Sequence, residues 1–153
     1  MNSTTNIFSL NVNGLRGSGR RRNIFKWLKE LEVDVFLLQD VRCENAEDRL
    51  QWTTEWGGVA EWREKVGILI QKEKGELKDN GDWSDRLIWE TWVRAGWGPV
   101  VIGSCYCPTE RGLYIDWIEG LLDVGALAEA GVDILGSNFN MIRDVTMDRS
   151  DGG

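Results

Sequence analysis

The chain has 153 residues, with 18 basic and 25 acidic side chains and a formal net charge of −7. This length predicts a single domain over residues 1–153, and 42% hydrophobic with 28% charged residues is a globular composition that excludes disorder, collagen and coiled coil. Its apolar runs are far too short to cross a bilayer.

The first third of the chain alternates between the two-residue period of strands and the 3.6-residue period of helices. Asn45 is the predicted N-cap of the second helix, since its side chain can accept a backbone N–H. The predicted elements are a strand at Ile7–Val12, a loop at Asn13–Gly19, a helix at Arg20–Leu31, a buried strand at Val33–Leu38 and a helix at Ala46–Trp56.

The middle of the chain has a different pattern, of apolar or alternating runs separated by turn signals such as Asn80-Gly81. It predicts consecutive antiparallel strands at Val59–Trp62, Val66–Lys72, Leu87–Arg94 and Pro99–Cys107. A helix at Tyr114–Ala130, a buried strand at Val132–Leu135 and a polar loop at Gly136–Gly153 are predicted to follow. Together these elements predict one α/β domain with a mixed sheet.

The chain contains no histidine. This excludes a Ser-His or Cys-His nucleophile and any imidazole metal ligand within it. Hydrolytic chemistry here would have to use carboxylates, amides and a metal ion. The N-terminus lacks the parts of a secretory signal, and three cysteines make no disulfide framework, so we expect an intracellular protein of the cytoplasm or nucleus.

Small polar, amide or carboxylate groups follow four of the predicted strands. They are Asn11-Val12-Asn13-Gly14, Gln39-Asp40, Tyr106 and Gly136-Ser137-Asn138-Phe139-Asn140. Because open α/β sheets bind ligands at the carboxyl ends of their strands, this coincidence predicts a functional site there.

Several short segments of the chain resemble the endonuclease/exonuclease/phosphatase superfamily, and most closely the AP-endonuclease-like domain of non-LTR (LINE-type) retrotransposons. These are NVNGLR, FLLQD, VGILI, SCYCPTERGL, ILGSNFN and DRSDGG, spread from Ile7 to Arg149. The resemblance implies a four-layer α-β-β-α sandwich with mixed, largely antiparallel sheets, truncated at the C-terminus. It also implies a metal-dependent phosphodiester hydrolase using Mg²⁺, with Mn²⁺ as an alternative.

The resemblance also implies roles for individual residues. Asn11 and Asn13 would line the metal and phosphate pocket, Asp40 would bind the metal in place of a glutamate, Tyr106 would contact the scissile phosphate, and Asn138 and Asn140 would take the two polar positions of a GDxN motif. An oxygen-ligated Mg²⁺ would neutralise the phosphate, and the amide and phenol groups would donate hydrogen bonds around it.

Two departures from the family pattern predict impaired catalysis. Asn138 stands where the family has an aspartate, and an amide has no useful basicity for activating water. Asp144 and Asp148 lie nearby in sequence as alternative bases. The family's histidine motif is missing, and we expect it to lie beyond Gly153.

Basic residues are concentrated at the start of the chain. Residues 1–29 hold six basic side chains and no acidic one, whereas the rest has a net charge of −13. The negative total charge does not favour a protein that coats nucleic acid by long-range attraction, but a local basic edge can hold a phosphate. Candidate phosphate contacts are Arg16, Arg20, Arg21 and Arg22, with the solvated face of a helix as the alternative.

Three functions remain open from the sequence: a retroelement DNA endonuclease, a catalytically dead relative acting as a binding or scaffold domain, and a phosphatase or phospholipid phosphodiesterase. Expected partners are DNA, and either a downstream reverse transcriptase or the missing C-terminal part of the domain, with no membrane. Cys105 and Cys107 are expected to be buried rather than metal-binding. Trp83, Trp89, Trp92 and Trp97 are expected to pack in the core rather than stack on bases.

Overall fold

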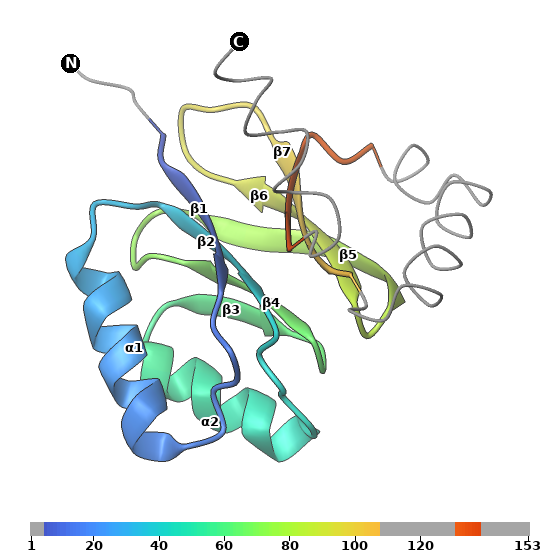
Figure 1. Ribbon diagram of the computed structural model, residues 1–153. Helices are drawn as coiled ribbons and strands as arrows, with labels where there is room; N and C mark the ends of the chain where they lie inside the picture. Colours follow the sequence, from blue (N-terminus) through green and yellow to red (C-terminus); the bar gives the residue numbers. More distant parts are fainter. Residues whose placement is uncertain (1–4, 108–130, 139–153) are drawn as a thin grey trace, which may run out of the picture.

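The computed structural model describes residues 5–107 and 131–138. They form two four-stranded sheets packed face to face, with both described helices on the outer face of the first sheet (Figure 1). The protein is therefore an α/β sandwich. Three of the four predicted layers are described, and the helix expected at residues 114–130 lies outside the described residues.

The first sheet has the strand order β1-β2-β4-β3. Strands β1 and β2 are parallel, and β4 is antiparallel to both β2 and β3. Their bounds are Ile7–Asn11 for β1, Val35–Gln39 for β2, Val59–Trp62 for β3 and Val66–Ile70 for β4.

The second sheet has the order β5-β6-β7-β8. Its first three strands are antiparallel neighbours, and β8 returns parallel to β7. The bounds are Glu76–Ser84 for β5, Leu87–Val93 for β6, Val100–Tyr106 for β7 and Ile134–Asn138 for β8.

Helix α1 (Ser18–Glu30) connects the parallel strands β1 and β2, and helix α2 (Ala46–Trp56) precedes β3. The predicted N-cap of α2 is confirmed, because the Asn45 side chain accepts the Asp48 N–H at 2.8 Å. Gly57 ends this helix in the left-handed conformation, with φ 81°. No helix within the described residues is long and apolar enough to span a membrane.

Strand β2 is buried on both faces, as its uninterrupted apolar sequence predicts. Phe36 and Leu38 pack towards the helices, among tryptophans of α2 and β3. Val35 and Leu37 pack towards the second sheet, with Ile88 among their neighbours. The helix-facing core contains edge-to-face aromatic pairs, which involve three of the nine tryptophans, namely Trp52, Trp56 and Trp62.

The middle of the chain corrects three expectations from the sequence. The predicted run of consecutive strands is divided between the sheets, since β3 and β4 complete the first. Strand β5 was not predicted, because Asn80-Gly81 lies at a shift in strand register, typical of a β-bulge, rather than in a hairpin turn. Strand β8 runs on through Gly136 to Asn138, where a loop was predicted, and Ile134 is 39% exposed rather than buried.

Glu90 introduces a carboxyl group into the space between the sheets. It lies on the same face of β6 as Ile88 and Trp92 and is only 2% exposed, and its Oε2 has no hydrogen-bond partner within the described residues. Burial raises the pKa of Glu90 to about 8, and the negative charge of Glu61 adds to this rise. Glu90 is therefore largely protonated at neutral pH.

This burial predicts a pH-dependent stability. The folded state holds the Glu90 proton up to a pKa of about 8, whereas the ordinary pKa of a glutamate is 4.5, so the free energy of unfolding should fall as pH rises between those values. We expect Glu90→Gln to remove this loss, worth up to about 1.4 kcal/mol per pH unit. Urea denaturation at pH 5.5 and pH 8 measures it. The exposed Glu76→Gln is the control, and equal pH dependence in both variants would contradict the assignment.

Candidate functional site

A chain of hydrogen bonds joins the two sheets near the ends of β2 and β7. The side-chain amide of Gln39, the last residue of β2, donates to the hydroxyl groups of Ser104 on β7 at 3.1 Å and Ser9 on β1 at 3.2 Å. The Ser104 hydroxyl in turn donates to the Leu38 carbonyl at 2.7 Å. Polar groups buried between sheets are stable only when paired in this way. The carboxyl ends of these strands are consequently held at one edge of the sandwich.

Gly136 brings β8 to the same edge. A Cβ atom at this position would lie 2.7 Å from the Ser9 hydroxyl and 2.9 Å from the Leu37 Cβ. Only glycine permits this approach of β8 to β1 and β2. With Tyr106 paired in register with Asn138, and Asn11 with Gln39, the four predicted strand ends converge.

The loops after β1 and β2 are hydrogen-bonded to each other. The Gly14 N–H donates to the Asp40 carbonyl at 2.6 Å, and the Asn11 side chain accepts the Asn13 N–H at 2.9 Å. Asp40, the predicted metal ligand, is 6% exposed. Both of its carboxylate oxygens accept hydrogen bonds from Arg42, at 3.0 Å each. Arg42 was not among the residues predicted from the sequence.

Tyr106 faces the space between the sheets and is half-buried. Partial burial raises the pKa of its phenol above the usual value, and the negative charge of Asp40 adds to the rise against the opposing charges of Arg86 and Arg42. The phenol therefore remains a hydrogen-bond donor at neutral pH. The Arg86 guanidinium lies 5.4 Å from the centre of the Tyr106 ring, and its Nη1 is buried without a partner among the described residues.

These residues do not fit the Mg²⁺ that the resemblance implies. Mg²⁺ requires oxygen ligands, and both oxygens of Asp40 are bonded to a cation. Within the described residues no group of three acidic, cysteine or histidine side chains could hold a metal ion. Asn140, Asp144 and Asp148 lie outside those residues, and of Asn138 only the backbone is described.

The four predicted phosphate-binding arginines occupy different environments. Arg16 is exposed and forms an ion pair with Asp48. Arg20 donates to the Val12 carbonyl at 2.8 Å, at the end of β1, and Arg22 is exposed. Arg16 and Arg20 are thus bonded to the loop and helix beside the strand ends.

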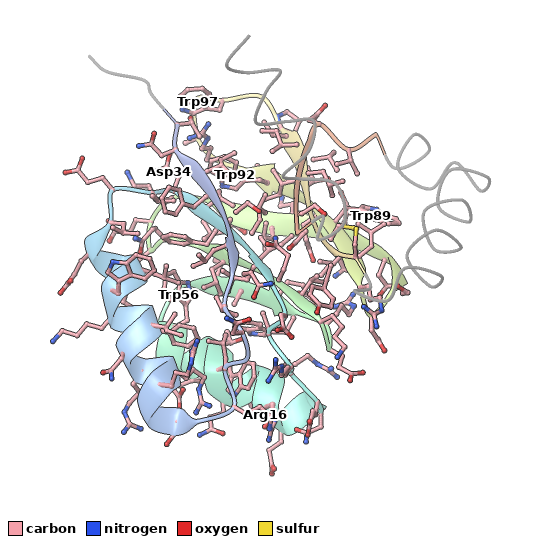
Figure 2. All side chains as sticks on the ribbon, viewed as in Figure 1. Arg16, Asp34, Trp56, Trp89, Trp92 and Trp97 are labelled. Carbon is pink, nitrogen blue, oxygen red and sulfur yellow. The ribbon has the colours of Figure 1, made fainter. Side chains whose placement is uncertain are left out.

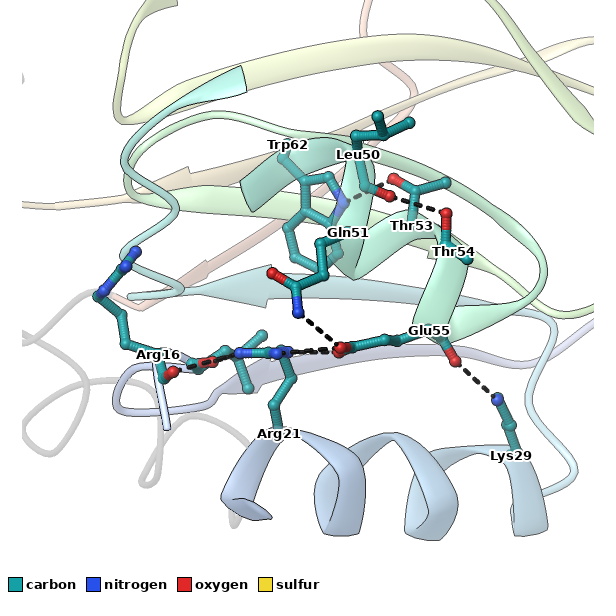
Figure 3. Close-up of polar contacts among 10 residues, drawn as sticks. Arg16, Arg21, Lys29, Leu50, Gln51, Thr53, Thr54, Glu55 and Trp62 are labelled. Carbon is teal, nitrogen blue, oxygen red and sulfur yellow. Dashed lines mark hydrogen bonds and ion pairs between the residues drawn. The ribbon is translucent and has the colours of Figure 1, made fainter. Parts of the chain in front are cut away.

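Arg21 differs from the other three because it is 3% exposed. Figure 3 shows its guanidinium reaching from α1 to Glu55 on α2, with Nε 2.6 Å and Nη2 3.1 Å from the carboxylate oxygens. Its Nη1 donates to the Leu15 carbonyl at 2.9 Å, and Trp52 lies against it. Every nitrogen is used inside the protein, so Arg21 joins the helices rather than contacting a phosphate.

The two cysteines are buried as expected. The expectation that the tryptophans pack in the core is confirmed for Trp92, met only in part by the half-buried Trp89, and wrong for Trp97. Cys105 and Cys107 are fully buried and Trp92 is 1% exposed. Trp97 is 45% exposed and stacks on the Arg94 guanidinium, which also lies over Trp92. Figure 2 shows Trp97 and Asp34 at the end of the sandwich opposite Arg16, away from the strand-end site. The side chain of Trp83 is outside the described residues.

Comparison with solved structures gives consistent matches. TDP2 from D. rerio, in complex with a single-strand DNA product, matches with TM-score 0.68 and 16% identity over 92% of this chain and 62% of that one. An endonuclease/exonuclease/phosphatase family protein from Bacteroides thetaiotaomicron matches with TM-score 0.63 and 12% identity, over 89% and 63% of the two chains. The chain has the endonuclease/exonuclease/phosphatase fold.

A retroelement protein shares this endonuclease/exonuclease/phosphatase fold. The endonuclease domain of TRAS1, a telomere-specific non-LTR retrotransposon, matches with TM-score 0.57 and 10% identity over 90% of this chain and 59% of that one. The chain thus spans about three-fifths of the length of each of these three structures. No protein-family model matches the sequence, and no curated protein is detectably similar.

The close approach at Gly136 is tested by Gly136→Ala. The added methyl group would meet Ser9 and Leu37 below 3 Å, so we expect a loss of about 1–3 kcal/mol in the free energy of unfolding. The control is Gly19→Ala on α1, where a Cβ meets nothing within 4 Å and alanine favours the helix. Chemical denaturation measures both, and equal stability of the two variants would contradict the packing of β8.

Arg21 is buried and Arg22 is exposed, so we expect substitutions at these two positions to differ in their effect on stability. Arg21→Ala would leave Glu55 and the Leu15 carbonyl without their partner, so we expect a loss of about 2 kcal/mol in the free energy of unfolding. Arg22→Ala removes an exposed side chain and should change stability by less than about 0.5 kcal/mol. Thermal unfolding of the two variants measures this. An Arg21→Ala protein as stable as the unmodified one would show that the ion pair does not contribute to stability.

Proposed function

We propose that the strand-end site binds the phosphodiester backbone of DNA, and that the chain descends from retroelement endonucleases but hydrolyses DNA poorly or not at all. The observation that carries the proposal is the composition of the site. It combines the guanidinium groups of Arg42 and Arg86 with the Tyr106 phenol, and its one described carboxylate, Asp40, is neutralised by Arg42. Guanidinium groups bind phosphate by charge and by paired N–H donors.

The folds of the matching proteins support a nucleic-acid substrate. One is a TDP2 complexed with single-strand DNA, and another is the endonuclease domain of a retrotransposon. The impairment follows from the residues of this chain. Asp40, the carboxylate that the described residues place near Tyr106, is paired with Arg42, and the sequence has an amide at position 138.

Binding is tested with a fluorescently labelled oligonucleotide at two salt concentrations. We expect an affinity that falls with salt, as phosphate contacts require, and that falls several-fold in Arg86→Gln. The control is Lys72→Ala, because Lys72 lines a hollow with Asn6 and Asp34 at the opposite end of the sandwich. Equal affinity in the two variants would place the DNA contact elsewhere.

Hydrolysis is tested by nicking of supercoiled plasmid in Mg²⁺, beside an EDTA control and Asp40→Ala. We expect no nicking above the EDTA background. Metal-dependent nicking that Asp40→Ala abolishes would contradict the impairment. Release of phosphate from a soluble ester without DNA binding would favour the phosphatase alternative.

A further inference from the structure

We propose that Arg42 is a built-in counter-ion of Asp40, which keeps divalent metal ions off this carboxylate and makes the strand-end site a metal-independent, arginine-based phosphate site. The inference rests on the proposed function only in taking phosphate as the ligand. It otherwise depends on the geometry of two residues, Asp40 and Arg42, and their surroundings.

The ion pair occupies both oxygens of the Asp40 carboxylate and leaves some N–H donors of the Arg42 guanidinium free to bind a ligand. Arg42 Nε and Nη2 each lie 3.0 Å from a different oxygen of Asp40. The Asp40 side chain is 9% exposed, whereas the Arg42 side chain is 52% exposed. A guanidinium has five N–H donors, so three remain after this pairing on a side chain that faces solvent. Arg42 can therefore hold Asp40 and an external phosphate oxygen at once.

The backbone around the pair is shaped to hold it. Asp40 and Arg42 both adopt left-handed conformations, with φ 60° and 62°, which are uncommon for residues other than glycine and are unfavourable for a long side chain such as that of Arg42. The loop after β1 stabilises them, because Leu15 N–H donates to the Val41 carbonyl at 3.0 Å and Gly14 N–H to the Asp40 carbonyl at 2.6 Å. Such unfavourable conformations persist only where the surrounding structure imposes them.

Gly14 adds a second adaptation for Arg42. It has φ +86°, and a Cβ there would lie 3.1 Å from both Cδ and Nη1 of Arg42. The arginine side chain thus lies across a position where a larger residue would crowd it. The loops after β1 and β2 therefore fix the position of the Arg42 side chain together.

A metal ion would have to displace this arrangement. The permanent positive charge of Arg42 cancels the charge of Asp40, the property that attracts a cation, and Asp40 raises the pKa of Arg42 further above its usual value. Within the described residues, no three acidic, cysteine or histidine side chains are grouped at Asp40 to restore an attraction for a cation. Phosphate, in contrast, meets a guanidinium that is already positioned.

The test is a titration with Mn²⁺, in which electron paramagnetic resonance measures the free ion. We expect no specific binding to the unmodified protein, and at least tenfold tighter binding to Arg42→Gln. The double variant Arg42→Gln/Asp40→Asn should lose that gain, because its carboxylate is gone. Arg42→Met is the second variant if Arg42→Gln does not fold, since it also removes the positive charge and every N–H donor, and the same gain is expected of it.

Two results would overturn the inference. One is Mn²⁺ binding to the unmodified protein that Asp40→Asn abolishes, and the other is a folded Arg42 variant with no gain. Oligonucleotide affinity, measured in EDTA and in Mg²⁺, separates this inference from the proposed function. We expect the same affinity in both, and a several-fold loss in Arg42→Gln. Absence of DNA binding with the Mn²⁺ gain intact would refute the function and leave the counter-ion role standing.

Discussion

The burial of β2 between two layers is the constraint on which the rest of the structure depends. All five of its residues are buried, with alternate side chains packed against the helices and against the second sheet. A strand in this position must satisfy its polar groups internally, and Gln39 does so by donating to Ser104 across the sheets. That hydrogen bond connects the packing of the core to the position of the strand ends, where the candidate site lies.

Immediately beyond this buried strand, the carboxylate of Asp40 is shielded from water and neutralised by an arginine. Asp40 is buried next to Gln39, and an isolated carboxylate there would be strongly unfavourable. Arg42 provides the compensation, and the loop after β1 holds the backbone in the required conformation. Glu90 shows the alternative outcome, in which a buried carboxyl group without such a partner has its pKa raised to about 8. The two acidic residues thus illustrate the two ways in which burial of a carboxyl group becomes tolerable.

Much of the fold was predictable because local sequence patterns determine where most of its helices and strands form. The bounds of α2 and its N-cap Asn45 agree with the structure, as do those of β3. Strand β5 was missed because its polar sequence is interrupted by a bulge, and bulges share the Asn-Gly signal of turns. The division of the middle strands between two sheets was not predictable from periodicity. Apolar and polar residues alternate in the same way whether consecutive strands lie in one sheet or in two.

The sequence by itself determined both described helices and most of the strands, the polar residues that follow four of those strands, and the absence of histidine chemistry within this chain, because each is a matter of residue type and local spacing. Only the tertiary structure decided which side chains pair there. Arg21 and Glu55 are 34 residues apart and meet because two helices pack on one sheet. Arg42 and Asp40 are close in sequence, but they pair through left-handed backbone conformations held by a different loop. Charge neutralisation depends on such distant contacts, so composition and motifs alone do not reveal it.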